Sequence, residues 1–396
     1  MIQAVRSTPT APTTAALLQS ERRLNEPMSQ DPSTSTDPQL LALRDRIDAI
    51  DRELLALLNK RAGVAQEVGE LKKRDGSPVF RPEREAQVID KLKQANPGPL
   101  RTDSIAPIWR EIMSASRALE ALTRVAYLGP AGTFSEQAAL GYFGSSIDKV
   151  PCVSIDEVFR ATSAGAADFG VVPVENSTEG VVARSLDLLL NTPLSIVGET
   201  SLLVRHNLLR KDPSSSGVIA VVAHAQALAQ CHTWLSEHLP QAERRPVSSN
   251  AEGARLASQD PSLAAIASTR AASEFGLHVV APAIQDDAHN RTRFAIVAHP
   301  HTHPTPKPTG HDCTSLVVSV TNRPGAVHDM LVPLKANGVS MTRFESRPAR
   351  SGQWEYFFYI DIEGHPDQPA VGLALKQLRE VCAFFKVLGT YPVDVH

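Results

Sequence analysis

The stretch V-V-P-V-E-N-S-T-E-G-V-V, from Val171 to Val182, decides the fold of the middle of this chain. An apolar run ends there at a polar cluster, and an apolar-periodic segment, Val181–Leu190, follows. This order predicts a strand, a polar turn and a helix. In an open α/β sheet such a turn lies in the ligand crevice, where amide groups at the next helix start favour an anion. Ordinary capping by Asn and Ser side chains is the alternative.

Other segments repeat this order of strand, loop and helix. The apolar run Val125–Leu128 leads through G-P-A-G-T-F-S-E (residues 129–136) into a helical pattern. Further apolar runs follow at residues 195–204, 218–222, 263–267 and 293–298. Such repeats predict two α/β lobes with a cleft between them. The glycine-rich loop lacks the Gly-Lys-Ser/Thr ending and the spacing of nucleotide-binding loops, so no nucleotide is expected.

Side chains that could contact a ligand gather at or near the ends of the predicted strands. They are Thr133, Phe134, Ser135, Glu175, Asn176, Ser177, Thr178, Glu179, His224, Gln226, Asn290, Arg291, Thr292, Arg293 and Phe294. Gln230 joins them because it lies four residues after Gln226 on the same helix face. His224 taken alone is more typical of a capping or structural histidine.

The residues before this region predict a three-helix, all-α unit. Residues 38–75 form one long pattern of apolar residues at helical spacing. A helix of this length must pack on other helices or on another chain. Pro82 fits the first turn of a second helix that runs to Gln94, and Ser104 can cap a third helix over residues 105–122.

Cations interrupt the apolar face of the long helix. Arg61 and Lys72 fall on nearly the same face, whereas Arg44 points elsewhere. Cations on an apolar face are costly unless paired, so an anionic ligand is expected there, and Arg44 would serve a second copy of the site. Long side chains that reach water from the edge of the stripe are the alternative. The unit also carries Arg84, Glu85, Ser116 and Glu120.

The C-terminal segment has the order strand, helix, strand, strand, helix, strand over residues 315–390, which indicates a ferredoxin-like α+β domain. The run H-P-H-T-H-P-T-P-K-P (residues 299–308) precedes it. Its histidines could bind a metal, but the prolines and the lack of acidic partners favour a stiff, extended linker.

Composition narrows the classes of function. The net charge of −3 argues against a general nucleic-acid binder, and no apolar run is long enough to span a membrane. The four cysteines have neither metal-ligand nor disulfide spacing, which fits a reducing cytoplasm. Residues 1–37 are rich in Ser, Thr, Pro, Ala and Gln and are expected to be disordered. A transit peptide and a start at Met28 both stay open.

The helical unit, residues 38–123, resembles the all-α chorismate mutase family. The matching positions are Arg44, Arg61, V-G-x-x-K ending at Lys72, R-P-E-R-E with Arg84 and Glu85, and Ser116 with Glu120. The resemblance implies a homodimer in which each site borrows Arg44 of the partner subunit. It implies that Arg44 and Arg61 hold the carboxylates of chorismate, a task that suits bidentate guanidinium groups.

The same resemblance assigns the remaining roles. Lys72 and Glu120 would address the breaking ether oxygen, and Glu85 would bind the ring hydroxyl. The rearrangement to prephenate needs no acid, base or cofactor, only the compact conformer and charge stabilisation. Glu120 can donate a hydrogen bond only when protonated, whereas many relatives have Gln there. Arg81 stands where some relatives carry Asp, which puts that contact in doubt.

The α/β region, residues 124–300, resembles prephenate dehydratase, a two-lobed, periplasmic-binding-protein-like fold. Three ordered motifs match: G-P-x-G-T-F-S (129–135), P-V-E-N-S-x-E-G (173–180) and T-R-F (292–294). The resemblance implies that Thr292 protonates the departing hydroxyl, Arg293 binds a carboxylate and Phe294 shapes the pocket. Asn176, Ser177 and Thr178 would orient the substrate. Relatives commonly read S-H-P-Q where this chain has A-H-A-Q, so the hydroxyl missing at Ala223 is either dispensable or reduces turnover.

The C-terminal domain, residues 312–396, resembles the ACT regulatory domain. P-G-A-V (324–327) and E-S-R-P (345–348) match its phenylalanine-sensing form, which usually has Leu in place of Val327. The resemblance implies that L-phenylalanine binds between paired domains. The residues would be Gly325, Ala326, Val327, Glu345, Ser346, Arg347 and Pro348. A structural or dimerising module is the alternative.

These resemblances together predict a cytoplasmic, multidomain, homodimeric enzyme with a linker at residues 301–311. It would rearrange chorismate to prephenate, convert prephenate to phenylpyruvate, and respond to L-phenylalanine, without metal, cofactor, nucleic acid or membrane. One rival keeps the mutase and uses the dehydratase fold for binding or regulation. A second rival is a non-enzymatic, solute-binding sensor; T-R-F and E-N-S argue against it, because a sensor needs no placed hydroxyl acid.

Overall fold

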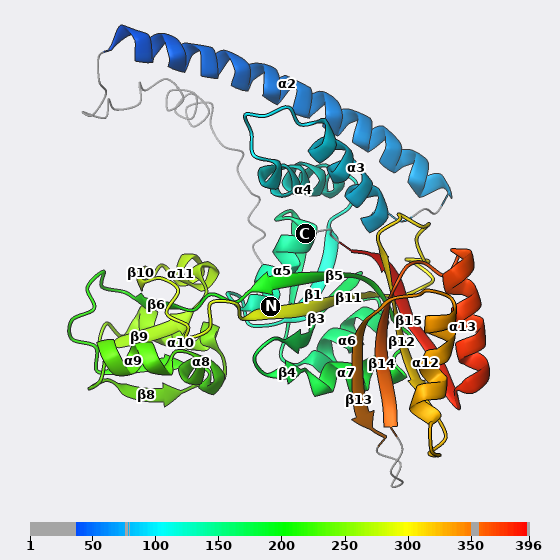
Figure 1. Cartoon of the computed structure of the whole chain (residues 1–396). Coiled ribbons are helices and arrows are strands. Elements are labelled where there is room, and N and C mark those ends of the chain that lie inside the picture. Colours follow the sequence, from blue (N-terminus) through cyan, green and yellow to red (C-terminus); the bar gives the residue numbers. More distant parts are fainter. Residues whose placement is uncertain (1–36, 76–77, 79, 350–355, 394–396) are drawn as a thin grey trace, which may run out of the picture. The chain divides into compact units, whose positions relative to one another are not determined.

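The computed structural model describes residues 37–75, 78, 80–349 and 356–393 (Figure 1). The predicted disorder of residues 1–37 and the question of Met28 therefore lie almost entirely outside the described residues. The chain divides into two compact units, Met1–Lys60 and Arg61–His396. Helix α2 (Pro38–Asp75) supplies the described part of the first unit and continues into the second, so the single long helix is confirmed.

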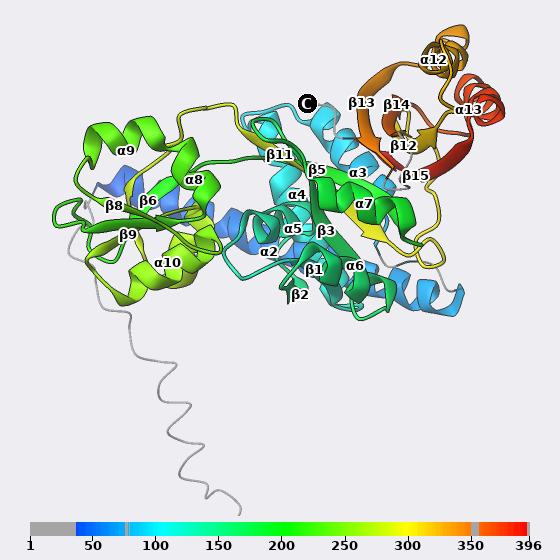
Figure 2. The same ribbon diagram turned by 90° about the horizontal axis from the view of Figure 1, so that it is seen from below.

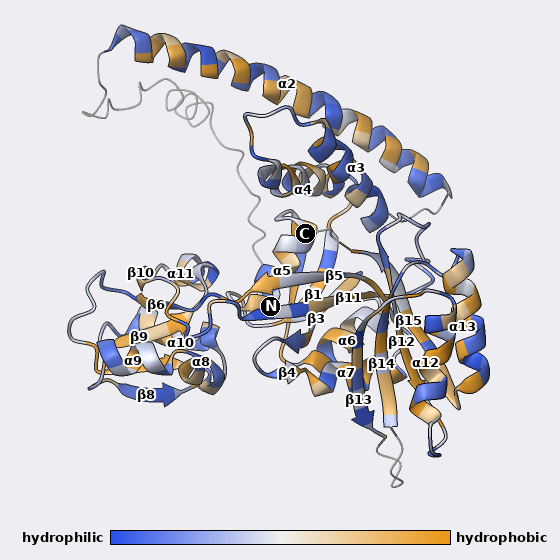
Figure 3. Ribbon diagram, viewed as in Figure 1, coloured by the Kyte–Doolittle hydropathy of each residue, from blue (hydrophilic) through white to orange (hydrophobic). Residues whose placement is uncertain are grey.

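Helix α2 presents an apolar stripe to solvent. The stripe comprises side chains that are each at least 50% exposed: Leu43, Ile47, Ile50, Leu54 and Leu57. Figure 3 shows orange, apolar segments alternating with blue, hydrophilic ones along α2. A long helix draws its stability from burying such a stripe, so this surface favours a partner.

Helices α3 (Pro82–Ala95) and α4 (Thr102–Ala118) complete the helical part. Pro82 occupies the first turn of α3, as predicted. The predicted start of the third helix is wrong by three residues. The backbone of Arg101 is extended and precedes the helix, so Ser104 lies inside the first turn and does not cap it.

The middle of the chain forms two α/β lobes, as predicted (Figures 1 and 2). The first lobe has the sheet order β2-β1-β3-β11-β5, with β4 beside β3. Its strands are β1 (Thr123–Leu128), β2 (Ile147–Cys152), β3 (Phe169–Asn176), β4 (Gly180–Val181), β5 (Ser195–Leu203) and β11 (Arg291–Ala298). Its helices are α5 (Phe134–Phe143), α6 (Ile155–Ser163) and α7 (Ala183–Asn191).

The second lobe has the sheet order β10-β6-β9-β7-β8. Its strands are β6 (Asn207–Arg210), β7 (Ala220–Ala223), β8 (Glu243–Pro246), β9 (Leu263–Ala267) and β10 (His278–Ala281). Its helices are α8 (Ala225–Gln230), α9 (His232–His238), α10 (Asn250–Gln259) and α11 (Thr269–Phe275). The chain passes from β5 to β6 and returns from β10 to β11, so the T-R-F motif lies on the strand that re-enters the first lobe.

The C-terminal domain is an antiparallel sheet of order β13-β14-β12-β15. Its elements are β12 (Asp312–Ser319), α12 (Ala326–Ala336), β13 (Met341–Pro348), β14 (Tyr356–Glu363), α13 (Pro369–Val381) and β15 (Phe384–Pro392). Both helices cover one face of the sheet (Figure 2). This order confirms the ferredoxin-like prediction. The other face joins the core of the first lobe through Val317, Tyr359 and Leu388.

The linker, residues 301–311, packs against the domains on either side of it. The His303 ring lies 4.3 Å from the Phe169 ring, and His365 bonds the Pro306 carbonyl through Nε2 at 2.8 Å. Burial lowers the pKa of His303 to about 4, so this ring is neutral at neutral pH. Among the described residues, no group of three His, Cys, Asp or Glu side chains could hold a metal. Within the same residues, no helix is long and apolar enough to cross a membrane.

Candidate active sites

A cavity of about 420 Å³ opens between the two α/β lobes. Ten of the side chains predicted for the cleft line it: Thr133, Phe134, Ser135, Asn176, Glu179, His224, Gln226, Gln230, Thr292 and Phe294. The structure therefore brings together residues from three motifs that are far apart in the sequence. Ser177, Thr178 and Arg293 do not line the cavity.

A chain of hydrogen bonds runs along the wall of this cavity. Asn176 Nδ2 donates to Thr292 Oγ1 at 2.9 Å and to Asn290 Oδ1 at 2.8 Å. Asn290 Nδ2 donates to Gln230 Oε1 at 3.0 Å. Asn176 is in turn held by the amides of Thr178 and Glu179, which donate to its Oδ1. The turn therefore fixes Asn176, and Asn176 fixes the Thr292 hydroxyl.

His206 ends this chain and was missed by the sequence analysis. Its Nε2 lies 2.9 Å from Gln230 Oε1, an amide oxygen that can only accept, so His206 Nε2 is the donor. Burial lowers the pKa of His206, and this effect outweighs the hydrogen bond with Gln230, which would raise it. The ring is therefore neutral at neutral pH. Its only sequence signal is a position just before the second lobe, where a lone histidine is ambiguous.

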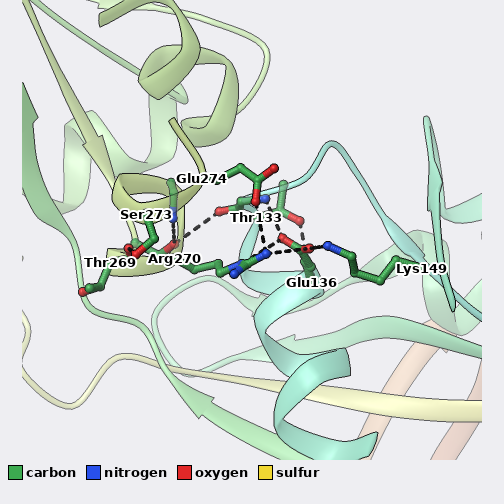
Figure 4. Close-up of polar contacts among 10 residues, drawn as sticks. Thr133, Glu136, Lys149, Thr269, Arg270, Ser273 and Glu274 are labelled. Atoms are coloured by element: carbon green, nitrogen blue, oxygen red, sulfur yellow. Dashed lines mark hydrogen bonds and ion pairs between the residues drawn. The ribbon is translucent and has the colours of Figure 1, made fainter. Parts of the chain in front are cut away.

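The glycine-rich loop is held by a buried carboxylate rather than by a ligand. Thr133 caps α5, and Glu136 accepts from the Gly132 amide at 2.7 Å. Glu136 also pairs with Lys149 at 2.8 Å and with Arg270 of the second lobe at 3.5 Å (Figure 4). Burial alone would raise the pKa of Glu136, but these donors together lower it. The carboxylate therefore stays ionised and ties the loop to both lobes.

Two residues of the E-N-S-T turn are structural here. Ser177 is exposed, and its Oγ accepts from the Arg291 amide at 2.9 Å. Thr178 is also exposed and contributes its amide to Asn176. Both serve the turn, which is the capping alternative raised by the sequence. His224 shows both roles, because it caps α8 and also lines the cavity.

Arg293 lies on the face of β11 opposite to the cavity. Its Nη2 is 2.5 Å from Asp361 Oδ2 on β14 of the C-terminal domain. The expected contact with a substrate carboxylate is therefore absent from this conformation. The physical reason is strand alternation: Thr292 and Phe294 face the cavity, so the residue between them faces away.

The helical part gathers a second set of candidates. Arg61 Nη1 donates to Ser116 Oγ at 2.8 Å, which places the two predicted residues together. Glu85 forms a buried ion pair with Arg117, a residue that the sequence analysis missed. Arg117 also donates to the Phe143 carbonyl at the end of α5. Arg84 is exposed, and Lys72 is half-buried.

Glu120 packs closely against helix α2. A Cβ on Gly69 would come within 2.5 Å of Glu120 Cγ, so this approach requires glycine. Glu120 Oε2 is buried and has no hydrogen-bond partner among the described residues. A buried polar atom without a partner is costly, and a bound ligand could satisfy it. Arg44 belongs to the first compact unit, where its side chain is exposed.

The two predicted motifs of the C-terminal domain belong to different elements. Gly325 has φ +79° and precedes α12, while Glu345, Ser346, Arg347 and Pro348 end β13. Ala326 is buried, whereas Val327 is 40% exposed. Arg347 pairs with Asp187 on α7 at 3.0 Å. Within the described residues of this one chain, Arg347 therefore contacts the first lobe.

Comparison with known proteins follows the same division of the chain. Residues 43–121 match the chorismate mutase type II family, residues 125–302 match prephenate dehydratase, and residues 314–380 match the ACT domain. A bifunctional chorismate mutase/prephenate dehydratase of Neisseria gonorrhoeae is 48% identical over 366 residues, which cover 92% of this chain and 99% of the relative. The chain belongs to the bifunctional chorismate mutase/prephenate dehydratase family.

Two further relatives agree with this assignment. A bifunctional enzyme of Aquifex aeolicus is 41% identical over 89% of this chain and 98% of its own length. The crystal structure of prephenate dehydratase from Arthrobacter aurescens, in complex with L-Phe, is 34% identical with a TM-score of 0.63. It covers 69% of this chain and 93% of its own chain. This chain therefore contains both enzyme domains and the ACT domain.

The departure at Ala223 lies outside the dehydratase cavity. Ala223 is fully buried at the end of β7 and does not line the cavity. The wall of the cavity is therefore formed without the side chain at position 223. The family assignment supports the bifunctional enzyme over the rival in which the dehydratase fold only binds or regulates.

Proposed function

We propose that the chain performs two consecutive reactions in separate sites under the control of an end product. The mutase domain rearranges chorismate to prephenate, and the cavity of the dehydratase domain converts prephenate to phenylpyruvate. The observation that carries the proposal is the Thr292–Asn176 hydrogen bond, which joins two family motifs at one cavity wall. L-phenylalanine is the proposed effector of the ACT domain, and the four free cysteines fit a reducing cytoplasm.

In the dehydratase site, Thr292 is proposed to protonate the hydroxyl that leaves the ring. That hydroxyl departs as water, the ring carboxylate departs as carbon dioxide and leaves its bonding electrons in the ring, which becomes aromatic, and Thr292 regains a proton from solvent water. A threonine hydroxyl is a weak acid, so proton transfer alone cannot account for the rate. Positioning by Asn176 lowers the barrier further, and aromatisation stabilises the product. Phe294 and neutral His206 shape the wall, while Ser135, His224 and Gln226 offer polar contacts to the substrate.

Prephenate carries two carboxylates, yet the described lining of the cavity contains no lysine or arginine. The N-termini of two helices carry partial positive charge, which can bind the two carboxylates. Thr133 caps α5, and Ser249 caps α10 from the opposite lobe. We assign the carboxylates to these two N-termini, which favour anions through their free amides. Closure of the lobes on the substrate would then bring both helix starts to it.

In the mutase site, Arg61, Lys72 and Ser116 are proposed to bind chorismate together with Arg44 of the partner subunit. Glu85 and Arg84 would complete the site. The exposed apolar stripe of α2 supports the homodimer, because pairing would bury it. The rearrangement then depends on holding one conformer and stabilising the ether oxygen.

Mutase activity is expected to depend on a hydrogen-bonding side chain at position 120. The buried Glu120 Oε2 has no partner among the described residues, which suits a contact with the ether oxygen of the bound substrate. Glu120→Gln keeps the shape and carries N–H donors, so it should retain mutase activity, whereas Glu120→Leu should lower it about 10²-fold. Equal activity of Glu120→Leu and wild type in a chorismate-consumption assay would refute this role of Glu120.

Phenylalanine sensitivity is expected to depend on Gly325. Its φ of +79° is a conformation that β-branched residues strongly disfavour, so Gly325→Val should displace the start of α12. We expect the phenylalanine concentration for half-inhibition to rise about 10-fold or more, with uninhibited turnover nearly unchanged. Val327→Leu, the residue usual in this family, is the matched control. Equal sensitivity of Gly325→Val and wild type would exclude this loop as the effector site.

A coupled assay tests the whole proposal. Purified protein receives chorismate, and prephenate and phenylpyruvate are followed with and without phenylalanine. Phenylpyruvate that appears and is suppressed by phenylalanine supports all three domains. Prephenate that accumulates without phenylpyruvate would contradict the dehydratase assignment.

A further inference from the structure

The strand pair β3–β11 faces the dehydratase cavity on one side and the ACT domain on the other. Thr292 pairs in register with Asn176, and both line the dehydratase cavity. The next register pair, Arg293 with Glu175, points to the opposite face. On that face, Arg293 and Glu175 contact the sheet of the ACT domain. Residues adjacent in sequence to the proposed catalytic pair are therefore the ones that contact the regulatory domain.

Two ion pairs join the domains at this place. Arg293 Nη2 lies 2.5 Å from Asp361 Oδ2 on β14, and Glu175 Oε2 lies 2.9 Å from Arg343 Nε on β13. Arg343 Nη1 is also 4.0 Å from Asp361, so the four side chains form one cluster. The Asp361 side chain is only 4% exposed, and Ser315 Oγ donates to its other oxygen at 2.6 Å.

The surroundings of the cluster hold the Arg293 guanidinium between the two domains and away from the cavity lining. The guanidinium faces a gap of about 10 Å³ lined by both domains, which is too small to admit prephenate. Glu199, 3.8 Å from Arg293 Nε, closes another side and accepts from Tyr391. Buried charges of this kind hold their geometry strongly, because losing one partner leaves the other uncompensated.

The cluster also lies next to the proposed effector motif. Arg343 is on β13, two residues before Glu345, which begins E-S-R-P. A shift of β13 on effector binding would act on Glu175 directly and on Arg293 through Asp361. Both act on strand ends that carry Asn176 and Thr292.

We propose that Arg293 is a positioning residue: the Arg293–Asp361 and Glu175–Arg343 pairs let the ACT domain set the Thr292–Asn176 geometry and transmit the effector signal to it. This inference rests on the role of Thr292 in the proposed function. It differs from the carboxylate-binding role that the family resemblance implies for Arg293. The two ion pairs are then the contacts through which the ACT domain and the dehydratase cavity are coupled, and coupling between two sites requires such contacts.

The test compares full-length Asp361→Asn with Asp156→Asn, which removes the half-exposed Arg184–Asp156 ion pair of the first lobe. Asp361→Asn is expected to lower the dehydratase kcat about 10-fold and to change KM for prephenate less than about 2-fold. It should also shift the half-inhibiting phenylalanine concentration about 5-fold or more. Asp156→Asn should match the wild type, and the mutase rate of each variant reports that the chain is folded.

Two further variants keep the proposal testable if Asp361→Asn folds poorly. The charge-reversed pair Arg293→Asp with Asp361→Arg should recover more kcat than either single change. Glu175→Gln, at a side chain that is 38% exposed, should lower kcat in the same direction as Asp361→Asn. No recovery in the reversed pair, together with a wild-type kcat in Glu175→Gln, would overturn the proposal.

Two outcomes of the kinetics would also overturn it. If Arg293 binds the substrate, Arg293→Gln raises KM about 10-fold or more while Asp361→Asn keeps wild-type kcat, KM and inhibition. If the cluster is only structural, kcat falls but the half-inhibiting concentration does not move. Failure of the proposed function would look different, because Thr292→Val would then retain its rate whatever Asp361→Asn does.

Discussion

Thr292→Val is expected to lower the dehydratase kcat by about 10³-fold, which corresponds to roughly 4 kcal/mol of transition-state stabilisation. Valine has the shape of threonine without the hydroxyl, so the cavity wall is kept and only the proposed proton donor is lost. The Asn176 amide, 2.9 Å from that hydroxyl, would also lose one of its acceptors. Formation of phenylpyruvate from added prephenate measures the effect, and KM should change little.

Thr292→Ser is the matched control, because it keeps a hydroxyl within reach of Asn176. Its kcat should lie much closer to wild type than that of Thr292→Val. The mutase rate of both variants should be unchanged, since the mutase site lies in another domain and shares no residue with the cavity. A Thr292→Val enzyme within about 3-fold of wild type would remove Thr292 from the mechanism and leave the acid unidentified.

Arg44→Ala and Arg61→Ala are each expected to lose mutase activity by about 10²-fold or more, while a mixture of the two recovers it. If each site takes Arg61 from one subunit and Arg44 from the other, a mixed dimer has one site with both arginines and one with neither. Random pairing of equal amounts should then restore about a quarter of the wild-type activity. Co-expression of differently tagged chains allows the mixed dimer to be purified and assayed.

The dehydratase rate of the same preparations is the internal standard. It should stay at the wild-type level in each single variant and in the mixture, because neither arginine is among the residues that line the dehydratase cavity. A mixture as inactive as its components would argue that both arginines serve one site within one chain. A monomer in solution would contradict both the borrowed arginine and the proposed burial of the α2 stripe.

Much of the cavity could be predicted because its residues follow strands at fixed positions. Asn176 ends β3, Thr133 caps α5 and His224 caps α8, and each of these is a local pattern of a few residues. Local patterns also located the long α2 helix. Strand alternation predicts that Thr292 and Arg293 lie on opposite faces of β11, but the family resemblance assigned both residues to the substrate.

Contacts between distant segments could not be predicted in the same way. The partner of Glu85 is Arg117, on a different helix, and His206 lines the cavity beside Gln230 of helix α8, to which it bonds. Neither pair shows a recognisable spacing between its two residues in the sequence, because each contact depends on how the lobes and helices pack. The start of α4 was misplaced for a local reason: Ser104 looked like a cap, but the extended residue before the helix is Arg101.

The sequence by itself therefore determined the order of the three domains, their fold classes and the side chains at their strand ends. These follow from hydrophobic periodicity and short motifs, which act over neighbouring residues. Only the tertiary structure decided which face each of those side chains serves. Thr292 faces the cavity and Arg293 faces the ACT domain, because the two faces of the sheet lie against different parts of the protein.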